Sequence, residues 1–196
     1  MRPFASLILL LFLSCHTSTD NLPILSYKVD DTGQKKFYTI TYDGFTNQLG
    51  ETFSTEHTKS NIYIANFFFT RCPSICPPMR NELISIAEEF SEEPDFMMIS
   101  HTIDPEHDSV SVLKAYGEAT DIPESKWQFL RASEDKTKQQ AELYMTNFKP
   151  HEDGSDFYHS SFVALVDKQQ HIRGFYNILV PEDVERLKND IQILLN

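Results

Sequence analysis

Basic residues are scarce in this chain. Its 196 residues include 17 lysines and arginines against 29 aspartates and glutamates, which gives a formal net charge of -12 at pH 7. This balance excludes sequence-independent binding to the phosphates of nucleic acid, so no nucleic-acid partner is expected. We interpret the excess of carboxylates as a solvated acidic surface. The chain also lacks internal repeats, and its length suits one domain with a sizeable core plus a tail.

Long apolar runs are missing as well. The N-terminal apolar run at residues 7–13 is far shorter than the roughly 18 residues that a transmembrane helix needs. Arg2 before it and the small Ser14 after it make the segment typical of a secretory signal. Ser14-Cys15 resembles the lipobox of bacterial lipoproteins, so Cys15 is the predicted lipidation site. An ordinary secreted form and an uncleaved signal anchor remain alternatives.

These features predict three segments along the chain. We expect a signal peptide at residues 1–14, a membrane tether at residues 15–35 and one folded domain at residues 36–196. The tether is polar, contains Pro23 and Gly33 and shows no sustained periodicity. The lipid would hold the protein on the extracytoplasmic, periplasmic face of a bacterial membrane.

Strand and helix patterns alternate through the rest of the chain. Residues 37–42 are β-branched and aromatic and end at Asp43-Gly44, which predicts a strand entering an N-terminal hairpin. The nearly unbroken apolar run at 61–70 predicts a central strand buried on both faces. Further strands are expected at 96–99, 127–130, 161–166 and 172–176, and helices at 79–90, 110–116, 136–145 and 181–195. The order predicts an α/β thioredoxin-like fold, in which helices flank a central sheet that is mixed because its last two strands form an antiparallel pair.

Cysteine is also rare, with three in the chain. If one carries lipid, Cys72 and Cys76 remain, and both face an oxidising compartment. Each precedes a proline, which disfavours helical backbone, so the segment between them is predicted to be a loop. Pro77 and Pro78 suit the first turn of the helix that follows. Cys76 then lies close to the helix N-terminus, where a thiolate is favoured, and a thiolate is the form that binds metals and attacks disulfides.

The two sulfurs leave more than one chemistry open. Soft thiolates select Cu(I) or zinc, and one added imidazole completes a low-coordinate copper site but leaves zinc short of its usual four ligands. Three protein ligands therefore favour copper. A purely redox dithiol and a structural disulfide remain alternatives, although a bridge across so short a loop would add little stability in the chain-entropy model.

Several segments together resemble the Sco/SenC family. The run Cys72-Pro73-Ser74-Ile75-Cys76-Pro77 is similar to the family's CPxxCP loop, and residues 100–108 are similar to its SxDPxxD segment. The resemblance continues through the strand at 127–130 and through His159-Ser160-Ser161-Phe162, and it ends after the strand at 173–176. It covers about residues 45–180 in the expected order.

The resemblance implies copper ligands at Cys72, Cys76 and His159, for Cu(I) and Cu(II). It also implies a membrane-anchored metallochaperone rather than an enzyme, which assists assembly of the copper A centre of cytochrome c oxidase. The partner would be that oxidase subunit or another copper protein. The rival is a thiol-disulfide oxidoreductase in which Cys72 and Cys76 are the catalytic pair that keeps the target cysteines reduced. His159 discriminates between the two, because dithiol exchange can proceed without it.

Other polar residues near these motifs have expected roles of their own. His101 and His107 flank the Asp104-Pro105 turn, and we expect surface or capping roles for both histidines. Asp104 is expected to shape the turn.

Two positions depart from the family's pattern. Tyr158 stands where an acidic residue often precedes the histidine, with Asp156 two positions earlier, so the role of that carboxylate around the metal is in doubt. Gln170 replaces the usual glycine of a turn, which should alter the hairpin and not the chemistry.

Overall fold

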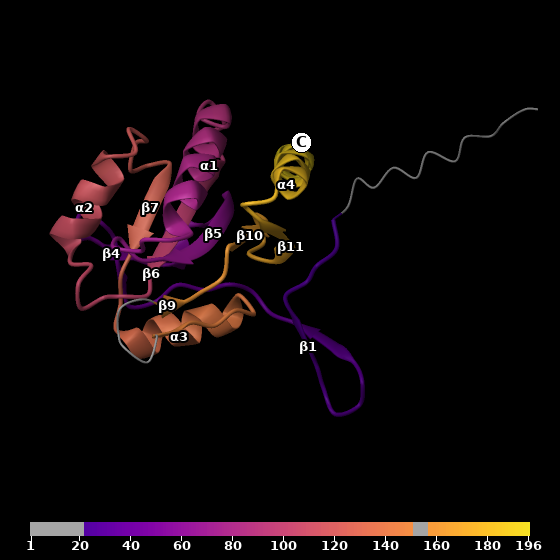
Figure 1. Cartoon of the computed structure of the whole chain (residues 1–196). Coiled ribbons are helices and arrows are strands. Elements are labelled where there is room, and N and C mark those ends of the chain that lie inside the picture. The colour runs from indigo at the N-terminus through magenta and orange to yellow at the C-terminus, as the bar shows by residue number, and fades with distance from the viewer. Residues whose placement is uncertain (1–21, 151–156) are drawn as a thin grey trace, which may run out of the picture.

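A five-stranded sheet forms the centre of the computed structural model, which describes residues 22–150 and 157–196 (Figure 1). The strand order is β11-β10-β5-β6-β7. The five strands are β5 (Ile62–Phe68), β6 (Phe96–Thr102), β7 (Trp127–Leu130), β10 (Phe162–Val166) and β11 (Ile172–Asn177). The first three pair in parallel, whereas β10 pairs antiparallel with both β5 and β11. This mixed sheet confirms the predicted thioredoxin-like α/β class.

The two central strands are buried along their whole length. Every residue of β5 is buried, as its unbroken apolar run predicts for a strand covered on both faces. The neighbouring β6 is also buried throughout but runs to Thr102, three residues past its predicted end at 99. Its polar end stays in the sheet because it finds buried partners, such as the hydrogen bond of 2.6 Å from Ser100 Oγ to Asn66 Oδ1.

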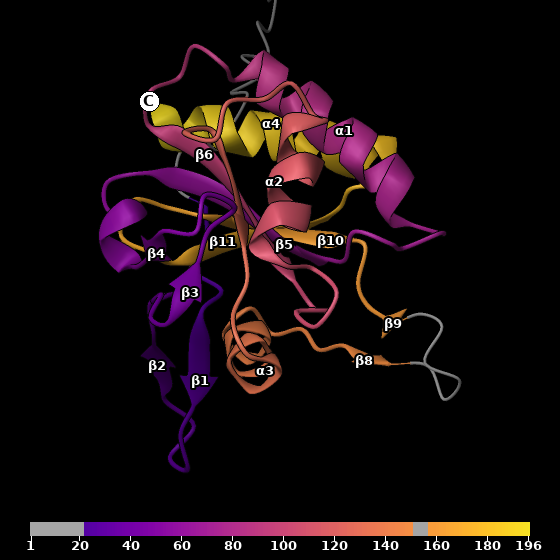
Figure 2. The ribbon, with the colours of Figure 1, turned by 90° about the vertical axis from the view of Figure 1, so that its left-hand side faces the viewer.

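Helices cover both faces of the sheet (Figures 1 and 2). On one face lie α1 (Cys76–Glu89) and α4 (Pro181–Leu195), and on the other lies α3 (Glu134–Leu143). The remaining helix, α2 (Val110–Glu118), packs against β7. Serine side chains start two of the helices, since Ser109 accepts from the backbone of Val112 and Ser133 accepts from that of Lys136. All four helices occupy the predicted parts of the sequence.

The N-terminal region differs from the prediction. It contains the hairpin of β1 (Tyr27–Val29) with β2 (Lys35–Phe37), then the pair β3 (Phe45–Thr46) and β4 (Thr52–Phe53) and the 3-10 turn η1 (Thr55–His57). The strand predicted at 37–42 is wrong after its first residue. The backbone there makes single hydrogen bonds to separate partners, from Ile40 N to Gln170 O and from Tyr42 N to Thr55 Oγ1, instead of one ladder.

The fold also begins before residue 36. Leu25 N donates to Ile172 O at 2.8 Å, and the side chain of Ser26 is completely buried. The tether predicted for residues 15–35 therefore does not reach residue 35. Residues 25 and 26 are hydrogen-bonded to Ile172 of β11, and the hairpin of β1 and β2 follows them. The signal segment and Cys15 lie outside the described residues. Within the part of the chain that the structure describes, no helix has the length and apolar character to cross a membrane.

Candidate metal centre

The cysteine loop follows the carboxyl end of β5 and leads directly into α1. The helix begins at Cys76, with Ile75 as its N-cap residue, and prolines occupy its first turn as predicted. Cys76 thus belongs to the first turn itself, where backbone N-H groups have no intrahelical acceptor. Both Cys72 and Cys76 are buried, and both are thiols in this structure.

His159 approaches the loop from a different part of the sequence. It follows a short antiparallel pair, β8 (Lys149–Pro150) with β9 (Phe157–Tyr158), which the sequence analysis does not predict. The imidazole stands edge-on to Phe69, with ring centroids 5.6 Å apart, and Phe69 also packs against Phe157 at 5.1 Å. His159 Nδ1 lies 3.3 Å from Ser160 O and can only donate to that carbonyl. With the proton on Nδ1, the lone pair of Nε2 faces the sulfurs.

The three predicted ligands come together. Nε2 of His159 lies 3.8 Å from Cys72 Sγ and 3.6 Å from Cys76 Sγ, and the three ligand atoms all lie within 4.8 Å of one another. Bonds of about 2.3 Å to thiolate and about 2.0 Å to imidazole, spread at about 120°, would separate sulfur from nitrogen by about 3.7 Å. A single ion therefore fits between these atoms with little movement. No other group of three potential metal ligands occurs among residues 22–150 and 157–196.

The surroundings of Cys72 favour ionisation of its thiol by lowering the pKa. Burial acts to raise its pKa, but hydrogen bonds from the backbone of Cys76 and Ser74 outweigh that effect, so the pKa of Cys72 lies below its ordinary value of 9.0. The Ser74 hydroxyl adds a further contact, with its oxygen 3.7 Å from Cys72 Sγ. The thiolate is the form that both metal binding and thiol exchange require.

A buried carboxylate fixes the loop to the sheet. Asp108 is fully buried and accepts hydrogen bonds from the backbone N-H and the hydroxyl of Thr70, two residues before Cys72. It also accepts from the hydroxyl of Thr102 at the end of β6. Because one carboxylate serves both elements, the start of the cysteine loop has a defined position relative to the sheet.

A second carboxylate supports the residue next to the first ligand. Asp104 accepts from Arg71 Nε at 2.8 Å and interacts with His107 Nδ1, also at 2.8 Å. His107 is exposed, which agrees with the surface role expected as one alternative. Asp104 closes the turn through its carbonyl, which accepts from Asp108 N. Neither belongs to the group of potential metal ligands.

The expectation for His101 is wrong. The residue is completely buried in β6, where its ring stacks on Phe67 at 4.7 Å and lies parallel to Tyr42 at 5.6 Å. Its Nδ1 lies 3.1 Å from Asn66 O, whereas Nε2 has no hydrogen-bond partner among the residues that the structure describes. Burial lowers the pKa of His101 to about 4, so it is neutral at pH 7. The turn beside His101 favours a surface role. The burial of this residue depends on aromatic neighbours from distant parts of the chain, which a local pattern does not contain.

The two departures from the family's pattern have different outcomes. Asp156 lies outside the described residues. Of Tyr158 in β9 only the backbone is described, and it pairs with Lys149 of β8. Gln170 adopts the left-handed conformation that glycine favours, with φ of 66°. Its side chain accepts from Thr58 Oγ1 at 2.8 Å, which ties the hairpin to the segment before β5 and does not involve the metal group.

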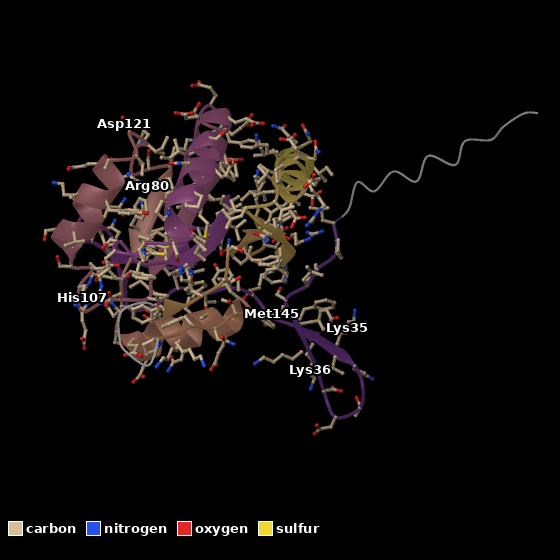
Figure 3. The ribbon with its side chains drawn as sticks, viewed as in Figure 1. Lys35, Lys36, Arg80, His107, Asp121 and Met145 are labelled. Atoms are coloured by element: carbon tan, nitrogen blue, oxygen red, sulfur yellow. The ribbon has the colours of Figure 1, made fainter. Side chains whose placement is uncertain are left out.

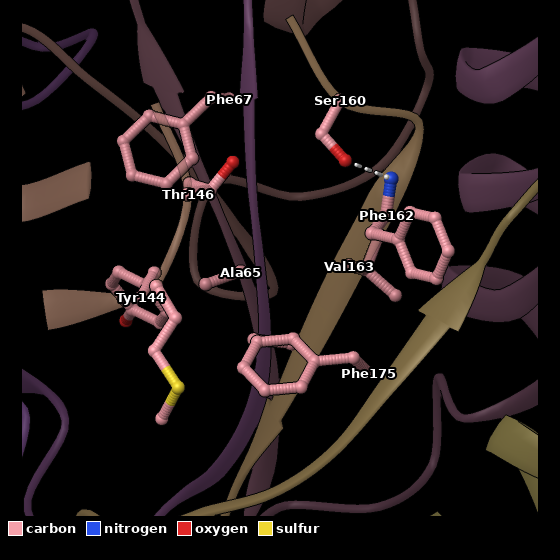
Figure 4. A pocket seen from close by; sticks show the side chains of 10 residues that line it. Ala65, Phe67, Tyr144, Thr146, Ser160, Phe162, Val163 and Phe175 are labelled. Carbon is pink, nitrogen blue, oxygen red and sulfur yellow. Dashed lines mark hydrogen bonds between the residues drawn. The ribbon is translucent and has the colours of Figure 1, made fainter. Parts of the chain in front are cut away.

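An apolar cavity of about 250 Å³ lies beside this centre (Figure 4). Its wall includes Phe67, Tyr144, Phe162 and Phe175, together with Ser160, the residue that follows His159 in the sequence. None of the three sulfur and imidazole ligands lines it. The cavity and the metal group are thus separate features.

Comparisons with known proteins agree with this geometry. The family model described as SCO1/SenC matches residues 30–196. A SCO1 protein homolog of Bacillus subtilis is 34% identical over 87 residues, which span 44% of this chain and 45% of that protein. A SCO2-like protein of Rickettsia typhi is 30% identical over 152 residues, which span 74% of this chain and 73% of that protein.

Solved structures share the fold. A SCO1/SenC family lipoprotein from Bacillus anthracis has a TM-score of 0.75 at 24% identity, covering 88% of this chain and 98% of its own. BsSco is a member of the Sco family of cytochrome c oxidase assembly proteins, in which a disulfide switch was identified. Its TM-score is 0.71 at 24% identity, and the match covers 90% of this chain and 98% of that chain. Yeast Sco1 with copper bound has a TM-score of 0.62 at 22% identity, and the match covers 79% of this chain and 87% of that chain. The chain belongs to the SCO1/SenC family.

Proposed function

We propose that this protein is a copper metallochaperone that takes up copper through Cys72, Cys76 and His159. The observation that carries the proposal is the spacing of the three ligand atoms, which suits one ion held by two sulfurs and a nitrogen. Two thiolates make the site soft, as Cu(I) requires, and the imidazole adds a donor that Cu(II) accepts. Copper is the cargo of the protein.

Uptake and release follow from the protonation of the ligands. Both thiols lose their protons as the ion binds, and the lowered pKa of Cys72 favours this step. The Nδ1-H of His159 is held by Ser160 O, so the ring can present Nε2 without changing its tautomer. Release proceeds when cysteines of an acceptor protein replace Cys72 and Cys76 one at a time, and the ligands here take up protons again.

The acceptor in this proposal is the copper A subunit of cytochrome c oxidase or another copper protein. Support comes from BsSco, which belongs to a family of cytochrome c oxidase assembly proteins, and from yeast Sco1, which was solved with copper bound. We further propose a lipid anchor at Cys15 on the periplasmic side of the membrane. The lipobox-like sequence supports it, as does the description of the Bacillus anthracis relative as a lipoprotein.

A second candidate is a thiol-disulfide oxidoreductase that keeps the cysteines of the acceptor reduced. The specific observation in its favour is the lowered pKa of Cys72, because a thiolate attacks disulfides. This activity needs the two sulfurs alone. His159 therefore separates the two candidates.

The test is to replace His159 with alanine and titrate the reduced wild type and variant with Cu(I) and Cu(II). We expect the variant to lose Cu(II) binding, to keep part of its Cu(I) binding through the sulfurs, and to keep thiol exchange with a model disulfide. His57→Ala is the matched control, because His57 is exposed and lies in η1, away from the metal group. Unchanged Cu(II) binding in His159→Ala would remove the residue from the ligand set. Normal oxidase assembly in cells carrying a copper-free His159→Ala protein would favour the oxidoreductase.

A further inference from the structure

An arginine lies on the same face of α1 as the second cysteine ligand. Arg80 follows Cys76 by four residues, a spacing that places two side chains next to each other on a helix, about 5–6 Å apart at Cβ. Helical side chains also lean toward the N-terminus, which directs Arg80 toward Cys76. Both residues line one small pocket between α1, α2 and the sheet, and Figure 3 places Arg80 between these two helices.

Tyr116 of α2 holds the guanidinium at this place. The guanidinium carbon of Arg80 lies 4.6 Å from the centre of the Tyr116 ring, and Arg80 Nη2 donates to Tyr116 O at 3.4 Å. Burial raises the pKa of Tyr116, the positive charge of Arg80 lowers it, and the negative charges of Cys76, Cys72 and Asp108 raise it further. Tyr116 thus lies within electrostatic range of the arginine and of both sulfurs.

Arg80 forms no ion pair among the described residues. Its Nε is buried and has no hydrogen-bond partner among them. Arg71, the residue before Cys72, is different, because Asp104 binds its Nε at 2.8 Å. The structure therefore places a cation without an ion-pair partner among the described residues in the same pocket lining as Cys76.

We infer that Arg80 compensates the charge of the copper-loaded dithiolate and thereby favours Cu(I) over Cu(II) in this site. A Cu(I) ion with two thiolates and a neutral imidazole carries one net negative charge, whereas the Cu(II) form carries none. A fixed cation nearby stabilises the first form relative to the second. Arg80 acts through space on the ligands and is not itself a ligand. The inference rests on the proposed function and adds a residue to it.

The experiment measures the Cu(II)/Cu(I) reduction potential of the full-length protein, purified in detergent and loaded with one copper. In Arg80→Met the potential should fall, with Cu(I) weakened relative to Cu(II) by about tenfold, which is about 59 mV for one electron. Such a change is what one charge at roughly 6–8 Å produces in a partly exposed site. Arg80→Lys keeps the charge and should restore most of the potential, and Arg80→Gln provides a second neutral variant if the methionine variant does not fold.

The matched control is Lys114→Met. It removes the same charge from α2, but Lys114 is exposed and lies 3.9 Å from Glu118 Oε1. We expect its potential to equal that of the wild type. An unchanged potential in Arg80→Met, an equal fall in Arg80→Lys or an equal fall in Lys114→Met would each overturn the inference, while leaving the proposed function intact. A wild type that binds no copper would overturn both.

Discussion

Replacing His101 with phenylalanine should remove a pH-dependent part of the free energy of unfolding. Burial lowers the pKa of His101 from 6.5 to about 4 in the folded protein, so between these values the unfolded chain binds a proton that the folded chain does not. Acid therefore favours unfolding: the stability present above pH 6.5 is lost as the pH falls toward 4. This lowering of the pKa corresponds to about 3 kcal/mol of stability in full and to about 2 kcal/mol at pH 5.

The assay is urea unfolding of copper-free, reduced protein at pH 7.5 and pH 5.0. Phenylalanine keeps an aromatic ring between Phe67 and Tyr42. It loses the hydrogen bond to Asn66 but also removes the buried Nε2, so at pH 7.5 we expect the free energy of unfolding to change by no more than about 1 kcal/mol. Between the two pH values the wild type should lose about 2 kcal/mol more than the variant. The exposed His57 provides the control, since His57→Phe should follow the wild type. Equal losses in the wild type and His101→Phe would refute the reasoning.

Two further substitutions test the supports of the site and the sheet. Asp108→Asn weakens the hydrogen bonds from Thr70 and Thr102, so it should lower the free energy of unfolding by about 2 kcal/mol and speed the loss of copper to a chelator. If the free energy of unfolding and the rate of copper loss are both unchanged, the loop does not depend on this carboxylate. Gly174→Ala should destabilise the protein by about 2 kcal/mol in thermal or urea unfolding, because the added Cβ would overlap the ring and hydroxyl of the buried Tyr176. A variant as stable as the wild type would mean that the ring can move away.

Periodicity predicts much of this fold. The apolar run of β5, the apolar stripe of α4 and the short strand β7 are all found where the sequence indicates them, because burial dictates their residue types directly. The polar end of β6 was not predicted, since its burial depends on hydrogen bonds to Asn66 and Asp108, which a local pattern does not contain. The strand predicted at 37–42 fails for the opposite reason. Its residues suit a strand, but within the described part of the chain no strand pairs with the segment beyond Phe37.

The site was predicted to a similar extent. Two cysteines in one loop are recognisable from the sequence as candidate metal ligands. The resemblance to the Sco/SenC family selects His159 from seven histidines. The structure then brings all three together. Arg80 was missed, although its spacing of four residues from Cys76 was visible, because one cation on a helix ordinarily points to solvent. Only the position of Tyr116 on another helix distinguishes it.

The ligands come from two separate stretches of the chain, and this has a thermodynamic consequence. His159 lies 83 residues after Cys76, so an ion bound to both would join the loop before α1 to the segment before β10. Because all three ligands are close together only in the folded chain, such an ion binds the folded chain more tightly than the unfolded one, in which Cys72 and Cys76 can still hold it. It would therefore add stability by mass action, up to about 4 kcal/mol when free copper is a thousand times its dissociation constant. Loading would then make the protein more resistant to heat and proteases, and each delivery of copper would return it to its looser form. Resistance to proteolysis would therefore report how much of the protein in a cell still holds its cargo.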